Sequence, residues 1–230
     1  MQVEERFGFP IVNADNIYEV LRERGIRPWE LVGEPIDLYE YLYLSKKLTE
    51  DEQKDLRFAP KSEVLLYKKP DGELWRGFRS VGKNWATTFM LFPDDLTLII
   101  GEWKHGADTI SLVPPTGVPR KLESMSDAAR REVEEETGFK PTSLTPLAGP
   151  EGIPMSARQA SQRYHPFLSV FDGLVERGPS SLDKNEQLQP VMIPVEEWLK
   201  LIEAGNVYED CAISVTYLAL RKLGRLQVVS

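Results

Sequence analysis

A short stretch of ordered acidic residues constrains the fold of this chain more than any other feature. Within residues 117–139, three glutamates are spaced three and four positions apart: Glu132, Glu135 and Glu136. A helix would place their carboxylates on one side, while apolar residues repeating every four positions would face a core: Met125, Ala129 and Val133. The pattern predicts an amphipathic helix that begins near Ser124 or Ser126 and ends at Gly138.

The glutamates of this helix need a partner. Several carboxylates on one patch repel one another unless they are solvated, paired with basic side chains, protonated or bound to a divalent cation. Arg130 and Arg131 cannot neutralise all of them. Oxygen ligands suit magnesium or manganese, which retain several waters and bridge to phosphates. The helix therefore indicates phosphoryl or nucleotidyl transfer to water, and a solvated acidic face without chemistry is the alternative from charge alone.

Composition narrows the class of protein. The chain has 230 residues, a net charge of −8 and a single cysteine, Cys211. One domain with an extension is expected at this length, and one cysteine excludes an internal disulfide framework. The negative charge argues against nucleic-acid binding. No apolar run approaches the roughly 18 residues of a membrane span, and no secretory signal is readable, so we expect a cytoplasmic protein.

Three segments are expected along the chain. Residues 1–60 have the pattern of a helical extension, with helices at 14–24, 37–47 and 50–56. Residues 61–82 predict a β-hairpin module, in which strands 63–68 and 73–79 flank a turn at residues 70–72. Residues 83–230 form the third segment, the expected catalytic domain.

Strands and helices alternate in the third segment. A second hairpin is predicted from strands 86–92 and 96–103, joined by a turn at residues 93–95. Further strands are expected at 109–113, 165–171 and 191–193, and further helices at 195–203 and 210–223. This mixture predicts an α/β layered domain.

The acidic stretch resembles the Nudix box at every position that the box specifies. These positions are Gly117, Glu123, Arg131, Glu132, Val133, Glu135, Glu136, Gly138 and Phe139. The match falls on the predicted strand, loop and helix that the box requires. The resemblance implies a Nudix fold, a mixed β-sheet sandwiched between α-helices, here with an N-terminal β-hairpin module and helical extension.

The resemblance also implies roles for individual residues. Metal ligands would be Glu132, Glu135, Glu136 and the loop carbonyl near Thr116 or Gly117, with Glu135 counted among the catalytic residues as well. Glu123 and Arg131 would form an ion pair that fixes the loop to the helix, and for Glu123 a ligand role stays open. Gly117 and Gly138 would serve the backbone, as a tight turn and as a helix cap.

Outside the box, residues 62–222 are similar to the ADP-ribose pyrophosphatase branch of the family. By position, Lys104 would contact substrate phosphate. Pro154 lies sixteen residues beyond Gly138, close to the position of the proline typical of ADP-ribose hydrolases. Arg163 ends a Ser-Gln-Arg segment that resembles Ser-Glu-Arg in the branch. Gln162 departs from that glutamate, which leaves the substrate open. Arg158 and Arg163 could clamp phosphate or ribose oxygens through their guanidinium groups.

A late loop is the expected source of the general base. Within residues 183–186, Glu186 is the first candidate and Asp183 the second, since a carboxylate there could take a proton from a metal-bound water. An ordinary acidic loop is the alternative for both.

The sequence thus predicts a magnesium-dependent enzyme, with manganese as a possible substitute. It would hydrolyse ADP-ribose or a similar nucleotide sugar to a nucleoside monophosphate and a sugar phosphate. The alternatives are hydrolysis of dinucleoside polyphosphates, NAD(H) or coenzyme A, and a non-catalytic Nudix-like nucleotide sensor. The expected partners are the small-molecule nucleotide diphosphate and, by analogy with the branch, a second copy in a homodimer. No nucleic-acid or membrane partner is expected.

Overall fold

The computed structural model describes residues 4–26, 49, 61–172, 177–181 and 187–226. The chain divides into two compact units. The larger comprises Met1–Pro28, Lys83–Met155 and Gln162–Ser230, and the smaller comprises Trp29–Gly82 and Ser156–Ser161. The helices predicted at 37–47 and 50–56 lie outside the described residues. The division into segments 1–60, 61–82 and 83–230 stays a prediction.

The larger unit is built on one mixed sheet with the strand order β10-β11-β5-β6-β12. These strands are β10 (Ile153–Pro154), β11 (Arg163–Val170), β5 (Trp85–Phe92), β6 (Leu96–Lys104) and β12 (Leu188–Pro194). Short strands extend the sheet: β7 (Thr109–Val113) on β6, β8 (Thr116–Gly117) on β5 and β9 (Thr145–Pro146) on β11. The β11–β5 pair is parallel and the other pairs are antiparallel.

β5 and β6 form a fork rather than a full hairpin. They follow one another through the predicted turn, the 3-10 segment Pro93–Asp95, yet they pair only at Leu91–Thr97 and Phe92–Leu96. Beyond that point β5 bonds to β8 and β6 bonds to β7. The predicted second hairpin therefore exists only at its turn, and the two strands separate to leave an opening.

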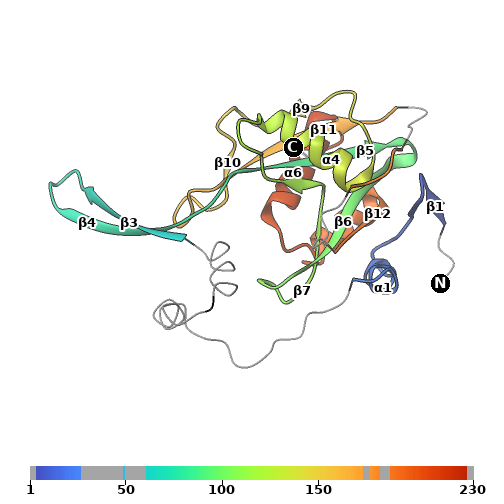
Figure 1. Cartoon of the computed structure of the whole chain (residues 1–230), viewed down its shortest axis with the longest axis horizontal. Helices are drawn as coiled ribbons and strands as arrows, with labels where there is room; N and C mark the ends of the chain where they lie inside the picture. The colour runs from blue at the N-terminus through green and yellow to red at the C-terminus, as the bar shows by residue number, and fades with distance from the viewer. Residues whose placement is uncertain (1–3, 27–48, 50–60, 173–176, 182–186, 227–230) are drawn as a thin grey trace. The chain divides into compact units, whose positions relative to one another are not determined.

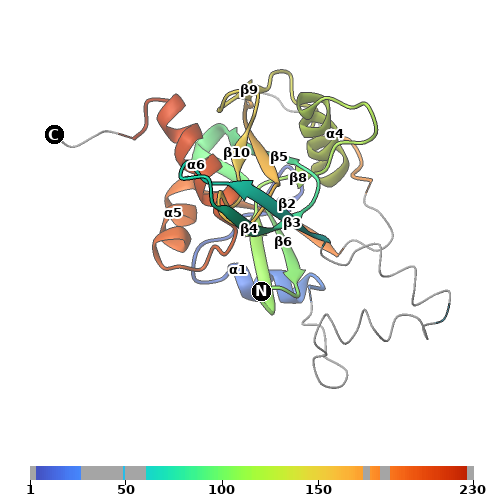
Figure 2. The same cartoon turned by 90° about the vertical axis from the view of Figure 1, so that its left-hand side faces the viewer.

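Helices cover both faces of this sheet (Figures 1 and 2). Ala86 of β5 clusters with Ala129 of α4 (Met125–Thr137). The preceding residue, Trp85, lies beside Cys211 of α6 (Asp210–Lys222). Because successive strand residues point to opposite faces, α4 and α6 pack on opposite sides. α5 (Val195–Glu203) lies with α6 (Figure 2). A mixed sheet between helices is the α/β Nudix arrangement predicted from the sequence.

An aromatic cluster anchors the end of α4 to the core. Phe139 has no exposed surface and contacts Phe92, whose ring stacks on Phe171 with a centroid distance of 4.6 Å. Phe7 and Phe9 from the N-terminal segment contact the same Phe139 ring. Burial of several aromatic rings is worth several kcal/mol. The helix that carries the glutamates is thereby held at its C-terminal end.

The N-terminal segment contains two short strands that the sequence did not predict, β1 (Glu5–Arg6) and β2 (Phe9–Pro10). The helix predicted at 14–24 is present as α1 (Ile17–Glu23). Ile17 and Leu21 of α1 are fully buried, so this part of the chain belongs to the core of the larger unit. No helix among the described residues is long and apolar enough to cross a membrane.

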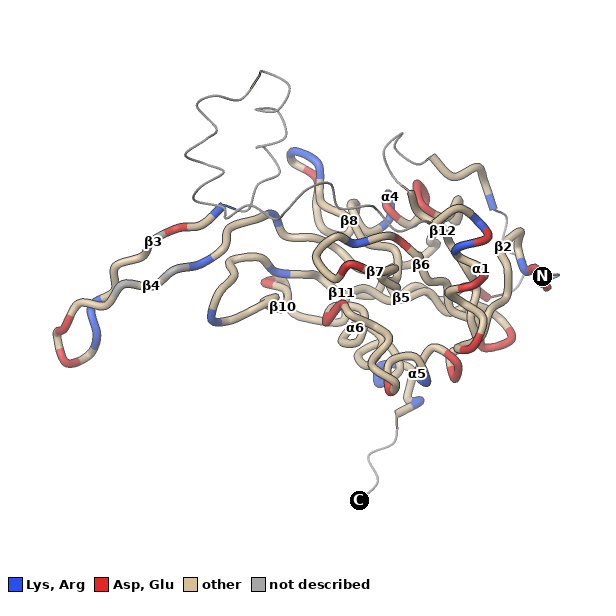
Figure 3. The backbone as a smooth tube through the Cα atoms, turned by 90° about the horizontal axis from the view of Figure 1, so that it is seen from below, with Lys and Arg blue, Asp and Glu red and all other residues tan. Residues whose placement is uncertain are grey.

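The smaller unit contains the predicted first hairpin. β3 (Lys61–Lys68) pairs with β4 (Leu74–Val81) over their whole length. Charged residues gather at its turn (Figure 3), where Lys69 pairs with Asp71 and Glu73. Several large apolar side chains of the hairpin are exposed: Leu66, Tyr67, Leu74 and Trp75.

Candidate active site

A cavity of about 300 Å³ lies at the fork between β5 and β6. The side chains and backbone that line it come from β5, β6, β7, the 116–118 loop, α4 and the start of α6. They are Trp85, Ile100, Glu102, Lys104, Val113, Thr116, Gly117, Val118, Glu136, Glu209 and Cys211. Four of them were predicted from the sequence as site residues: Lys104, Thr116, Gly117 and Glu136. We call this cavity the fork pocket.

Two of the predicted ligands, Glu132 and Glu136, lie against the 116–117 backbone, which lines the fork pocket. Thr116 donates its backbone N–H to Glu136 Oε2 at 3.3 Å, and Glu136 is only 8% exposed. Glu132 lies against Gly117, where a Cβ atom would come within 1.9 Å of the Glu132 carboxyl carbon. The absence of a side chain at Gly117 therefore allows the loop backbone to approach the carboxylate. The sequence predicts a tight turn at this glycine and gives no sign of the contact with Glu132.

Arg131 forms ion pairs with three carboxylates. Its guanidinium donates to both oxygens of Glu123, at 2.9 and 3.0 Å, and to the Val118 carbonyl at 3.0 Å. It also pairs with Glu132 Oε1 at 2.6 Å and with Glu135 Oε2 at 2.8 Å. The Glu123–Arg131 pair implied by the Nudix box is thus present and ties the loop to the helix.

The same contacts shift the protonation equilibria. Hydrogen bonding to Arg131 lowers the pKa of Glu123 below its ordinary value. The Glu123 hydrogen bond, followed by those to Glu135 and Glu132, raises the pKa of Arg131. Both shifts favour the charged forms of Glu123 and Arg131, so this ion pair is maintained at neutral pH.

Both ends of α4 are capped as the sequence predicted. Ser124 accepts a hydrogen bond from the Asp127 N–H at 3.1 Å, so the helix begins after Ser124. Gly138 closes the helix with a φ of 78°, the left-handed conformation that glycine adopts without strain. A Cβ at Gly138 would also lie 2.1 Å from the Gly178 carbonyl oxygen. Glycine is required there for both reasons.

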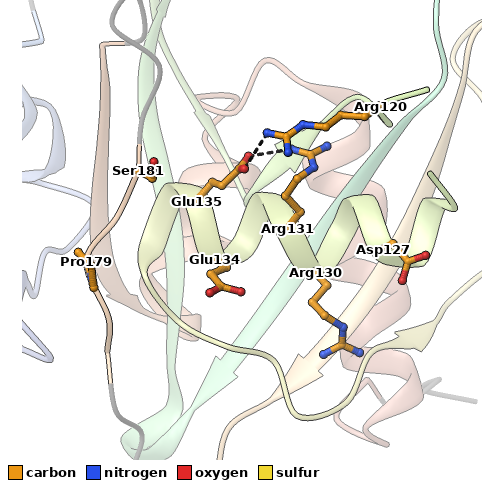
Figure 4. A pocket seen from close by; sticks show the side chains of 8 residues that line it. All are labelled: Arg120, Asp127, Arg130, Arg131, Glu134, Glu135, Pro179 and Ser181. Atoms are coloured by element: carbon orange, nitrogen blue, oxygen red, sulfur yellow. Dashed lines mark hydrogen bonds and ion pairs between the residues drawn. The ribbon is translucent and has the colours of Figure 1, made fainter. Parts of the chain in front are cut away.

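A second cavity, of about 380 Å³, lies along α4 (Figure 4). It is lined by Arg120, Asp127, Arg130, Arg131, Glu134, Glu135, Pro179 and Ser181. Glu135 points to Arg120 and Arg131, and Glu134 points away from them (Figure 4). The glutamates of the box are therefore divided, because Glu136 lines the fork pocket and Glu135 lines this outer cavity.

Lys104 stands at the rim of the fork pocket. Its ammonium pairs with Glu102 Oε2 at 2.7 Å, and the lysine side chain is 41% exposed. An exposed pair of this kind is weak and easily exchanged for another anion. The Lys104 ammonium therefore lies at the fork pocket in an ion pair that another anion can displace.

The two predicted arginines lie elsewhere. Arg163 begins β11 and donates to the carbonyls of Glu151 and Gly152, at 3.3 and 3.1 Å. It is absent from the residues that line the fork pocket. Arg158 belongs to the smaller unit, where it lines a cavity with Tyr67 and Trp75. Their substrate roles stay predictions.

Asp183 and Glu186 lie outside the described residues. The described residues that flank them contact the site elements. The Ser181 N–H donates to the Glu135 carbonyl at 2.7 Å, and Leu188 pairs with Glu102 of β6. Arg177 begins the preceding stretch and donates to the Thr137 carbonyl at 2.9 Å.

Sequence reasoning did not identify every residue of the two cavities. Glu102 and Glu209 line the fork pocket, and Arg120 pairs with Glu135 in the outer cavity. Glu102 could have been found, because it is two positions from Lys104 on one strand and strand residues alternate. Glu209 comes from the distant start of α6 and has no sequence signal. Burial raises the pKa of Cys211 to about 11, so its thiol stays protonated and is no nucleophile.

The donor set is suited to a hard divalent cation. Glu132 lies beside the Gly117 backbone, where a Cβ would take its space, and Glu136 Oε2 accepts from the Thr116 N–H. Within the described ranges, no three His, Cys, Asp or Glu side chains are grouped as a ready ligand set. Glu135 is held by Arg120 and Arg131 instead. The residue types fit the cation, and Glu135 would have to exchange an arginine for it.

Comparison with known proteins agrees with this fold. The family profile described as "NUDIX domain" matches residues 83–211, more than half of the chain. The chain therefore belongs to the Nudix hydrolase family.

Two curated relatives refine the comparison. The chain is 31% identical over 109 residues to "ADP-ribose pyrophosphatase" of Bacillus subtilis (strain 168), a match that covers 47% of this chain and 57% of that protein. It is 26% identical over 185 residues to "ADP compounds hydrolase NudE" of Escherichia coli (strain K12), covering 76% of this chain and 94% of that protein. The chain thus spans little more than half of the first relative and nearly all of the second.

A solved structure shares the fold. The "Crystal structure of ADP compounds hydrolase" superposes with a TM-score of 0.60 and 23% identity, covering 73% of this chain and 90% of that one. The match supports the Nudix fold.

Proposed function

We propose that this protein hydrolyses the diphosphate linkage of ADP-ribose, or of a similar nucleotide sugar, in a reaction that depends on magnesium or manganese. The products are a nucleoside monophosphate and a sugar phosphate. The observation that carries the proposal is the fork pocket, where Glu136 and the 116–117 backbone lie in one cavity with the cationic Lys104. The names of the two curated relatives support the choice of substrate.

The proposed ligands are Glu132, Glu135, Glu136 and the carbonyl near Thr116. A bound divalent cation supplies charge neutralisation for the diphosphate and a more acidic water. Glu123 and Arg131 have a different task, since their ion pair holds the loop against α4. Because this pair is only 15% exposed on each side, it keeps the carboxylates in place when substrate and water exchange.

Substrate binding is assigned to cationic side chains. Lys104 would leave Glu102 and bind a phosphate oxygen, which offsets part of the repulsion between the diphosphate and the Glu136 and Glu209 carboxylates in the same pocket. Arg158 and Arg163 remain candidates for phosphate or ribose oxygens, and they rest on the sequence pattern. Trp85 at the pocket wall offers a flat apolar surface for a base or a sugar face.

The proposed general base is Glu186, with Asp183 as the second candidate. Support comes from the described residues on either side, because the Ser181 N–H donates to the Glu135 carbonyl and Leu188 lies opposite Glu102 in the β12–β6 pair. The base would accept a proton from the attacking water. Comparing Glu186→Gln with Asp183→Asn tests which residue is the general base. The variant that lacks the base should lose kcat with little change in KM.

Product analysis across a panel of diphosphates tests the function directly. The panel contains ADP-ribose, dinucleoside polyphosphates, NAD(H) and coenzyme A, each with magnesium, with manganese and with chelator. We expect AMP and ribose phosphate from ADP-ribose at the highest kcat/KM, and no product with chelator. Preference for another compound would reassign the substrate. Tight ADP-ribose binding with no product would establish a nucleotide sensor and overturn the proposal.

We also propose a homodimer in which the hairpin of the smaller unit contacts the second copy. Tyr67 and Trp75 are half-exposed and pack on each other, with ring centroids 6.0 Å apart. Exposed aromatic side chains grouped in this way mark interaction surfaces. A cytoplasmic location, with no nucleic-acid or membrane partner, remains the prediction from composition.

A further inference from the structure

Glu135 is bound by two arginines that differ in their surroundings. Arg131 reaches Glu135 Oε2 from a position that is 15% exposed, and it also holds Glu123 and Glu132. Arg120 reaches Glu135 Oε1 at 2.8 Å from the loop before the helix, and its side chain is 66% exposed. Both arginines are drawn on the same side of Glu135 in Figure 4. The Arg131 contact belongs to a packed network, whereas the Arg120 contact is a single ion pair at the surface.

The Arg120 pair can open at little cost. Exposed ion pairs contribute at most about 1 kcal/mol, because water and salt replace the partner. The backbone of Arg120 is fixed independently, since its N–H donates to Glu123 Oε2 at 2.7 Å. The guanidinium can therefore leave Glu135 while the loop stays in place. Arg131 lacks this freedom, because leaving Glu135 would disturb two further carboxylates.

Glu135 cannot serve a divalent cation and Arg120 fully at the same time. The guanidinium occupies Oε1 of the carboxylate, and its positive charge repels a second cation nearby. Displacement frees the Nη2 donor that binds Glu135, and the planar guanidinium fork then has a geometry that matches phosphate oxygens. The released group would still be tethered beside the same helix.

We propose that Arg120 is a displaceable counterion of Glu135: it neutralises the carboxylate in the cation-free protein and moves to an oxygen of the substrate diphosphate when the cation takes its place. The counterion role of Arg120 does not depend on the proposed function, whereas its contact with the substrate diphosphate rests on it. Arg120 would thus be a substrate-binding residue whose guanidinium is paired with Glu135 until the cation binds.

The first test measures cation affinity without substrate. Mn²⁺ is titrated by electron paramagnetic resonance into the wild type, Arg120→Ala, Arg120→Lys and the control Lys121→Ala, whose exposed lysine is the next residue. We expect Arg120→Ala to bind Mn²⁺ about two- to fivefold more tightly, because a competing surface pair is removed. Arg120→Lys and Lys121→Ala should stay near the wild type. Equal or weaker binding by Arg120→Ala would overturn the counterion role.

The second test measures KM and kcat for the preferred diphosphate of the panel. We expect KM to rise about tenfold in Arg120→Ala, the loss of one charge-assisted hydrogen bond, with kcat changed less than KM. Arg120→Lys should recover part of the loss because it keeps the charge. Tighter Mn²⁺ binding with an unchanged KM would leave Arg120 a counterion alone and overturn its substrate contact.

The two tests also separate this inference from the proposed function. If the wild type turns over no diphosphate, the proposed function and the substrate half of the inference both fail. The Mn²⁺ titration still decides the counterion half in that case.

Discussion

The fork pocket and the β3–β4 hairpin are both built from adjacent antiparallel strands, but they differ in how completely those strands pair. At the fork, strands β5 and β6 give up pairing with each other, and α4, α6 and the short strands β7 and β8 surround the opening. In the hairpin, β3 and β4 pair completely, yet apolar side chains such as Trp75 stay 54% exposed. Incomplete pairing inside a packed sheet leaves room for a cavity, whereas complete pairing in an isolated hairpin leaves apolar side chains exposed.

The largest effect is expected at the fork, from Glu136→Gln. The variant keeps the size of this buried side chain and removes its charge, so kcat should fall about a thousandfold, equivalent to about 4 kcal/mol of transition-state stabilisation. Steady-state kinetics with magnesium measure the change. The matched control is Glu134→Gln on the outer side of α4, where Glu134 pairs with the exposed Lys140, and its activity should stay within about twofold. Equal losses in both variants would contradict the assignment.

The next largest effect is expected on the free energy of unfolding, from a substitution of Arg131. Arg131→Met leaves Glu123, Glu132 and Glu135 without their shared cation, so unfolding free energy should fall by about 3 kcal/mol. Urea unfolding measures this loss. Arg130→Met is the control, since Arg130 donates to one carbonyl, that of Pro141.

The pH dependence of that loss has a defined sign. Arg131 lowers the pKa of Glu123, so its stabilisation is complete above the ordinary carboxyl pKa of about 4.3. It disappears as the pH falls through the lowered value in the folded protein. The gap between the wild type and Arg131→Met should therefore narrow below about pH 4. A constant gap would show that Arg131 acts through packing.

A smaller effect is expected at the hairpin. Trp75→Ser should weaken the proposed homodimer about thirtyfold, the cost of a central aromatic contact of about 2 kcal/mol. Sedimentation at several concentrations measures the dissociation constant. Tyr217→Ser on α6 is the control, because Tyr217 has a similar exposure of 51%. A monomeric wild type would refute the homodimer, and equal weakening by both variants would move the interface away from the hairpin.

The smallest effect is a gain of stability in the loop before α4. Leu122 has a φ of 68° and is 98% exposed, so its backbone conformation is strained and its side chain buries almost no apolar surface. Leu122→Gly should raise the free energy of unfolding by about 0.5 kcal/mol, the relief of strain less the entropy of the added glycine. Thermal unfolding checks the sign. Lys121→Gly, which has no such strain to relieve, should be neutral or destabilising.

Several elements were predictable because their causes are local. The capping serine, the left-handed glycine and the three-and-four spacing of the glutamates define α4 within one residue of its observed ends. Strand 109–113 and helix 195–203 were predicted with their observed bounds for the same reason. The short strands β8, β9 and β10 escaped prediction, because two-residue strands exist only through their partners.

The sequence by itself determined that this chain belongs to the Nudix family and which residues form its acidic helix, since both follow from the order of residues over 23 positions. The tertiary structure decided which cavity each of those residues lines and which side chains it contacts. It divided Glu135 and Glu136 between two cavities, added Glu102 and Glu209 to the fork pocket, and paired Arg120 with Glu135. The physical reason is that spacing fixes which side of a helix a carboxylate occupies, whereas its partners come from segments that only folding brings near.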